Sequence, residues 1–137
     1  MADTIKIVVV TPDAKALEAD VDMVTLTGIG GEMGILPGHM ALMTQLVAGE
    51  IIARKNGENI FLAVGDGFVQ VTGERVAILT DMAIKADDID EAAAADAMRK
   101  AEARLAQKLS NEEAATVQAS LTHAATQLKV KQRHKKI

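Results

Sequence analysis

The 137-residue sequence predicts a β + α fold, in which an N-terminal antiparallel β-sandwich precedes a C-terminal antiparallel two-helix hairpin. All ten glycines lie between Gly28 and Gly73, and from Glu74 onward the chain has no glycine, proline or aromatic residue. Short β-branched runs fill the first half, whereas apolar residues recur at steps of three and four in the second. Because glycine and proline interrupt helices and form turns, this segregation predicts a β domain at residues 1–85 and a helical domain at residues 86–137.

Short apolar runs between turn residues predict seven strands in the first domain. These runs are residues 5–10, 21–27, 40–46, 51–55, 59–64, 68–71 and 76–79. Asn56-Gly57 gives the strongest hairpin signal, since both residues tolerate the positive φ angles of a tight turn. Many short strands at this spacing are typical of a sandwich or a barrel.

Capping patterns and apolar stripes predict two helices in the second domain. Asp88–Glu91 and Ser110–Glu113 both fit a capping box, in which side chains satisfy the free N–H groups of the first turn. The stripes are Ala94, Met98, Ala101, Leu105 and Leu109, then Val117, Leu121, Ala124 and Leu128. Alanine forms helix well but buries little surface, so the two stripes hold the helices together only loosely. This pattern fits a hairpin that can detach from the sandwich as well as one that is permanently docked.

Charge is distributed unevenly along the chain. Residues 1–85 contain eleven acids and six bases, whereas residues 86–137 contain eight acids and nine bases. No acid follows Glu113, and the end of the chain carries Lys129, Lys131, Arg133, Lys135 and Lys136. Cations favour a helix C-terminus, but five of them exceed that need. They indicate either a tail that binds an acidic protein surface or anionic groups, or a merely solvated basic end.

The composition also excludes several classes of function. Without cysteine the chain has no disulfide, thiolate zinc site or cysteine nucleophile. Two phenylalanines are the only aromatics and the net charge is −4, which argues against a nucleic-acid partner. The three histidines are isolated in sequence and no catalytic motif occurs, so we expect no catalytic residues, metal or cofactor. No apolar run reaches the roughly 20 residues of a membrane span, so we expect no direct membrane insertion.

The most distinctive stretch is GEMGILPGH, at residues 31–39. Glycines and one proline restrict its backbone. Its apolar residues, Met33, Ile35 and Leu36, lie between the polar residues Glu32 and His39. A rigid loop with apolar side chains is typical of a contact surface, and the alternative is a buried connection. The glycines of residues 28–34 do not have the spacing of a nucleotide-binding motif and fit a hairpin turn better.

This stretch resembles the G-E-x-G-I-x-P-G-H loop of the epsilon subunit of bacterial F-type ATP synthases. The resemblance extends through Val10-Thr11-Pro12, Gly65–Val71, Asp88–Ala92 and Gln127–Val130. It implies a ten-stranded sandwich, a two-helix domain and a place in the central rotor, between the gamma subunit and the c ring. It also implies a peripheral location at the cytoplasmic face of the bacterial inner membrane. Catalysis would belong to the alpha and beta subunits, so the chain itself would not be an enzyme.

The resemblance implies roles for particular residues as well. Glu32 and His39 would face the polar loops of the c ring, and we include Met33 and Ile35 in that surface. The hairpin would leave the sandwich, reach the alpha and beta subunits and inhibit ATP hydrolysis. Its basic residues would meet acidic segments of beta as a set, consisting of Lys129, Lys131, Arg133, Lys135 and Lys136.

One motif departs from the family. Members that bind ATP on the folded hairpin carry I/L-D-x-x-R-A, whereas residues 89–94 read IDEAAA, with Ala93 at the arginine position. A methyl group cannot replace a guanidinium as a partner for polyphosphate, so we expect weak or absent ATP binding. An ATP-sensing module that binds nucleotide on the hairpin is the alternative function. A third reading is an unrelated sandwich adaptor.

Overall fold

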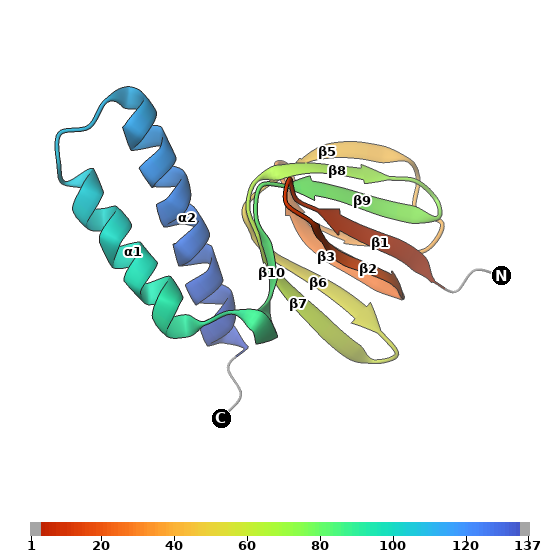
Figure 1. Cartoon of the computed structure of the whole chain (residues 1–137). Coiled ribbons are helices and arrows are strands. Elements are labelled where there is room, and N and C mark those ends of the chain that lie inside the picture. The colour runs from red at the N-terminus through yellow and green to blue at the C-terminus, as the bar shows by residue number, and fades with distance from the viewer. Residues whose placement is uncertain (1–3, 135–137) are drawn as a thin grey trace.

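The computed structural model describes residues 4–134, and Figure 1 shows a curved β-sheet body beside a helical hairpin. The strands are β1 (Ile5–Val10), β2 (Lys15–Val21), β3 (Met23–Gly28), β4 (Gly31–Ile35), β5 (Leu42–Leu46), β6 (Gly49–Lys55), β7 (Glu58–Val64), β8 (Gly67–Val71), β9 (Arg75–Thr80) and β10 (Ala83–Lys85). The helices are the 3₁₀ helix η1 (Ala86–Asp88), α1 (Glu91–Leu105) and α2 (Asn111–Arg133). The predicted fold class is confirmed.

The ten strands form one continuous sheet that folds over itself. Its order is β10-β7-β6-β3-β5-β8-β9-β1-β2, with β4 paired to β3 outside this path. The halves join where Gly28 of β3 pairs with Leu46 of β5. The pairs are antiparallel except that β1 runs parallel to β9, so the expectation of an antiparallel sandwich holds for all but this pair.

The core of the sandwich consists of branched aliphatic side chains from nearly every strand. On β1, Ile5, Ile7 and Val9 alternate inward and are fully buried, as strand geometry requires. They meet inward-facing residues of the other strands, including Leu26, Ile51, Leu62 and Ile78. Each such side chain stabilises the fold by about 1.5–3 kcal/mol because it leaves water. The close packing of these side chains makes the sandwich stiff.

The local sequence patterns missed three of the ten strands that the resemblance implies, and one of the three changes the interpretation of the GEMGILPGH segment. Its first five residues form β4 rather than a loop, because a tight turn brings them back along β3 in register. Gly31 has a φ of 124°, which suits glycine. At Gly34 a Cβ would lie 2.6 Å from the Met23 Cε, so glycine leaves room for this side chain.

The two helices form as expected but with one different start. Asp90 is the N-cap of α1 and accepts a hydrogen bond from the Ala93 N–H (3.0 Å). The capping box predicted at Asp88 is wrong, because that residue belongs to η1. The box at α2 is confirmed: Ser110 Oγ accepts from the Glu113 N–H, and the Glu113 carboxylate accepts from the Ser110 N–H.

Candidate interaction surfaces

The GEMGILPGH segment divides its side chains between core and solvent. Glu32 is exposed at the start of β4, whereas Ile35 has 0% of its surface exposed and Met33 packs half-buried against the core. The prediction that Ile35 contacts a partner is therefore wrong, because its inward position on β4 pairs it with Val24 in the core. Leu36, which is 54% exposed, is the apolar side chain that this segment presents to solvent.

The second half of the segment is a turn fixed by hydrogen bonds. The Gly38 N–H donates to the Gly73 carbonyl (2.9 Å), and the His39 N–H donates to the Leu36 carbonyl (3.1 Å). The His39 ring lies 2.8 Å from the Met40 carbonyl oxygen through Nδ1. Glu32 and His39 thus lie beside opposite ends of β4, and no hydrogen bond or ion pair joins them within residues 4–134.

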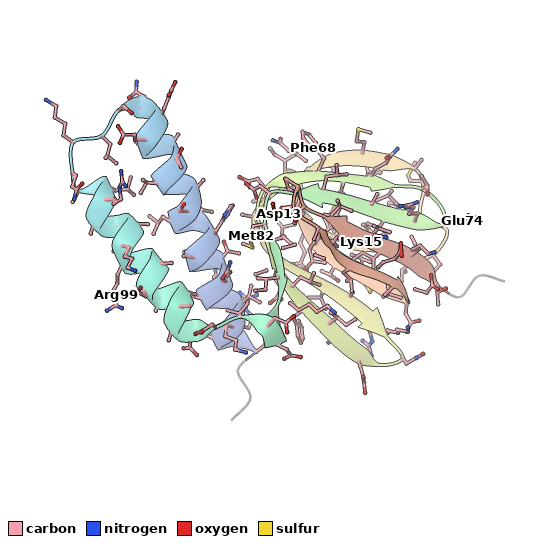
Figure 2. All side chains as sticks on the ribbon, viewed as in Figure 1. Asp13, Lys15, Phe68, Glu74, Met82 and Arg99 are labelled. Atoms are coloured by element: carbon pink, nitrogen blue, oxygen red, sulfur yellow. The ribbon has the colours of Figure 1, made fainter. Side chains whose placement is uncertain are left out.

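An outward apolar face lies on the sheet that β5, β8 and β9 form. It consists of Met43, Phe68 and Leu79, whose surfaces are 69%, 61% and 58% exposed. Phe68 pairs directly with Leu79, and residues paired in this way share a face. Figure 2 shows Phe68 at the upper edge of the sheet body, on its outer side. Exposed large apolar side chains gathered on one face are typical of protein interfaces.

The end of α2 is held on the sandwich by polar and aromatic contacts. Arg133 donates to Oε1 of Glu50 (3.4 Å), and Nε2 of His134 hydrogen-bonds Oε2 of the same carboxylate. The His134 ring also stacks on Phe61, with ring centroids 3.5 Å apart and planes 12° from parallel. Lys131 Nζ donates to the Ala86 carbonyl (3.1 Å). These six residues are called the C-terminal clasp below.

A second contact lies in the middle of α2. His123 Nε2 is 3.2 Å from Oδ1 of Asp81, in the turn between β9 and β10. A Cβ on Gly65 would lie 1.9 Å from that same oxygen, so glycine at this position makes room for the pair. His123 is one of the three histidines that are isolated in sequence, and it gains a partner because the fold brings Asp81 to it.

A groove between the end of α2 and the sheet brings two predicted sets of residues together. Its volume is about 490 Å³, and its walls include Glu32 of β4, Thr25 and Thr27 of β3, and Lys129 and Arg133 of α2. Lys129 is exposed and makes no hydrogen bond or ion pair with residues 4–134. Of the basic set, Lys135 and Lys136 lie outside the described residues.

The hollow between α1 and α2 near Ala93 is poor in positive charge. Asp88, Asp90, Ser120 and His123 supply polar groups to its walls, and no lysine or arginine lines it. Two aspartates without a basic neighbour disfavour a polyphosphate, and weak or absent ATP binding stays a prediction. On the solvent side of α1, the hydrogen bond and charge of Lys100 hold the pKa of Asp96 below its ordinary value.

Within residues 4–134 no cluster of three or more histidine or acidic side chains could hold a metal ion. None of the described helices combines the length and the apolar character needed to cross a bilayer.

The comparison with family models places this architecture in a known group. Residues 4–86 match the model of the ATP synthase delta/epsilon chain β-sandwich domain, and residues 87–132 match that of the delta/epsilon chain long alpha-helix domain. The chain therefore belongs to the ATP synthase delta/epsilon family, and the resemblance found in the sequence is confirmed.

Within that family, this chain is similar to curated epsilon chains. The ATP synthase epsilon chain of Dehalococcoides mccartyi is 41% identical over 133 residues, covering 96% of this chain and 95% of the relative. The epsilon chain of Anoxybacillus flavithermus is 44% identical over 105 residues, covering 77% of this chain and 78% of the relative.

Solved structures show the same fold at lower identity. A chain in the mitochondrial ATP synthase of Euglena gracilis (OSCP/F1/c-ring) superposes with a TM-score of 0.73 and 24% identity, covering 90% of this chain and 79% of that one. A chain in the central stalk/c-ring structure of the Tetrahymena thermophila mitochondrial ATP synthase has a TM-score of 0.55 and 14% identity, with 96% of both chains covered.

Proposed function

We propose that the chain is a non-catalytic rotor subunit in the central stalk of an F-type ATP synthase, at the cytoplasmic face of the bacterial inner membrane. There it joins the gamma subunit to the c ring. The domain of residues 1–85 serves this coupling, and the domain of residues 86–137 serves regulation. The observation that carries the proposal is the presence of two outward surfaces on one stiff body: the apolar face and the exposed part of the GEMGILPGH segment. A rotor joint must transmit torque without deforming, and a close-packed sandwich suits that task.

The apolar face is the proposed contact with gamma. Met43, Phe68 and Leu79 are too exposed and too apolar for a face that stays in water, and β5, β8 and β9 hold them rigidly. The variant Phe68→Asp places a charge in the centre of this contact, so the tagged chain should no longer copurify with gamma. The variant Gln70→Asp, on the same strand beside the centre, serves as a milder control. Undiminished copurification of Phe68→Asp would contradict this assignment.

Glu32 and His39 form the proposed polar contact with the c ring. Met33 supports β4 by packing against the core of the sandwich. Glu32 is exposed, and the hydrogen-bonded turn at residues 36–39 holds His39 in place. Polar side chains on a rigid element can pair with polar loops of a neighbour without large ordering costs. Leu36 adds apolar area to this contact.

Regulation is the proposed role of the hairpin. Its buried side chains are mostly small, namely Ala94, Ala101, Val117 and Ala124, with Val130 buried near the clasp. Its polar contacts with the sandwich are concentrated in the clasp and the His123–Asp81 pair. Such a hairpin can leave the sandwich at low cost and bring the basic set to acidic segments of beta. Deleting residues 88–137 should preserve assembly of the complex but raise its rate of ATP hydrolysis. An unchanged rate would mean that the hairpin does not inhibit.

The alternative, an ATP-sensing module, has less support. The hollow beside Ala93 carries two aspartates and no basic wall, which is the wrong charge for a polyphosphate. A hairpin without that site would respond to its protein contacts rather than to nucleotide.

A further inference from the structure

Glu50 differs from the other acids of the sandwich because, among residues 4–134, its carboxylate pairs with the end of α2. The side chain is 10% exposed, and its ion-pair partners, Arg133 and His134, both come from the end of α2. Each oxygen has its own partner, Oε1 with Arg133 and Oε2 with His134. A carboxylate this enclosed is costly without such partners, so the docked helix end and Glu50 depend on each other.

The surroundings of this carboxylate fix the helix end in one position. Phe61 of β7 stacks on the His134 ring, and the Ala86 carbonyl of η1 accepts from Lys131. Val130, one turn before His134, is buried against Ala63, Ala86 and Ile89. These contacts align the helix end before it pairs with Glu50. The alignment favours an ion pair of one defined geometry.

The clasp divides the basic set of α2 into engaged and free members. In the docked form Arg133 is engaged by Glu50 of the sandwich and Lys131 by the Ala86 carbonyl of η1, whereas Lys129 is exposed without a partner among residues 4–134. A base that pairs with the chain's own carboxylate is not available to an acidic surface on another protein. Docking and binding elsewhere therefore compete for the same guanidinium.

We propose that Glu50 is an internal receptor for the end of α2, which keeps the hairpin docked and withholds Arg133 from acidic partners. The inference rests on the proposed regulatory function, since it names the contact that restrains the hairpin. Glu50 is a positioning residue here and takes no part in chemistry. Loss of its charge should release the helix end while leaving the sandwich and the helices themselves intact.

The first experiment measures docking in the full-length purified chain. Because the sequence contains no cysteine, Glu58→Cys on β7 and Gln118→Cys on α2 accept two spin labels at unique sites. Pulsed electron spin resonance then gives the distribution of distances between sandwich and hairpin. With Glu50→Gln the population of undocked, longer distances should rise about fivefold or more, since a charged hydrogen-bond pair is lost.

Matched variants separate the receptor role from general damage. Glu74→Gln removes an exposed carboxylate in the turn between β8 and β9, which Figure 2 shows at the far side of the sheet body, and should leave the distances unchanged. Arg133→Gln should release the hairpin like Glu50→Gln, whereas Lys129→Gln should not. Distances that stay the same in both Glu50→Gln and Arg133→Gln would overturn the inference, provided that circular dichroism shows both variants folded.

The second experiment uses the assembled ATP synthase and distinguishes this inference from the proposed regulation. If both hold, Glu50→Gln lowers the rate of ATP hydrolysis because the released hairpin inhibits more often. Released distances with an unchanged hydrolysis rate support the receptor role and contradict the regulatory function. Lowered hydrolysis with unchanged distances contradicts the receptor role, because Glu50 would then act without moving the hairpin.

Discussion

The sandwich and the hairpin bury very different side chains, although they belong to one short chain. The largest fully buried residues, among them Ile7, Ile51 and Ile78, all lie in the strands. The interface between α1 and α2 buries alanines and Val117 instead. Buried area sets the free-energy cost of opening, so the difference predicts that the hairpin opens at lower cost than the sandwich.

The largest expected effect comes from removing one core side chain in each region. Ile7→Ala should lower the free energy of unfolding of the sandwich by about 2–5 kcal/mol. The substitution leaves a cavity in the core, and the paired strands around it cannot move in to fill it. Val117→Ala removes two methyl groups from the helix interface and should destabilise the hairpin by about 1.5 kcal/mol. Chemical denaturation followed by circular dichroism and by strand amide signals in NMR measures both.

The comparison between the regions fails if these two variants behave alike. Val117→Ala should leave the denaturation midpoint of the strand signals in place and shift only the helical signal. A common shift of both signals would show that sandwich and hairpin unfold as one unit.

A smaller effect is expected at the proposed ring contact. Glu32→Gln together with His39→Gln leaves the core untouched, since Glu32 is exposed and His39 lies outside the core cluster, with a hydrogen bond to the Met40 carbonyl. The assembled enzyme should hydrolyse ATP at a normal rate but pump fewer ions for each ATP. Glu58→Gln, an exposed carboxylate on β7, is the matched control. Normal pumping in the double variant would show that other groups make the contact.

The smallest effect is expected for nucleotide binding to the isolated chain. Calorimetry with ATP should give no binding heat in the micromolar range, because Ala93 and the two aspartates offer no partner for phosphate. Micromolar binding would mean that the hairpin senses nucleotide after all, and would reinstate the alternative function.

The outcome for particular residues shows what a sequence pattern can predict. The short apolar run at residues 5–10 predicted β1, and the segregation of glycine predicted the change from strands to helices. β4 was missed because its glycines are typical of a loop and because only pairing with β3 makes it a strand. The same pairing directs Ile35 inward, which a reading of the segment as a loop could not reveal.

The contacts between the two domains could not be predicted from local patterns. Glu50 and His134 are 84 positions apart, and the Asp81–His123 pair depends on the space left by Gly65. Isolated histidines carry no local signal of their partners, because these partners come from other strands and turns. The apolar face was also missed, since Phe68 alternates with buried residues on β8 in the way of any half-exposed strand.

Native-state hydrogen exchange of the full-length chain tests the central claim most directly. It measures the free energy of opening for individual backbone amides in both regions at once. Amides of α1 and α2 should exchange through a local opening that leaves the strands closed, with protection factors far below those of β1, β6 and β9. Equal protection in the helices and these strands would contradict the claim that a closed sandwich carries a releasable hairpin.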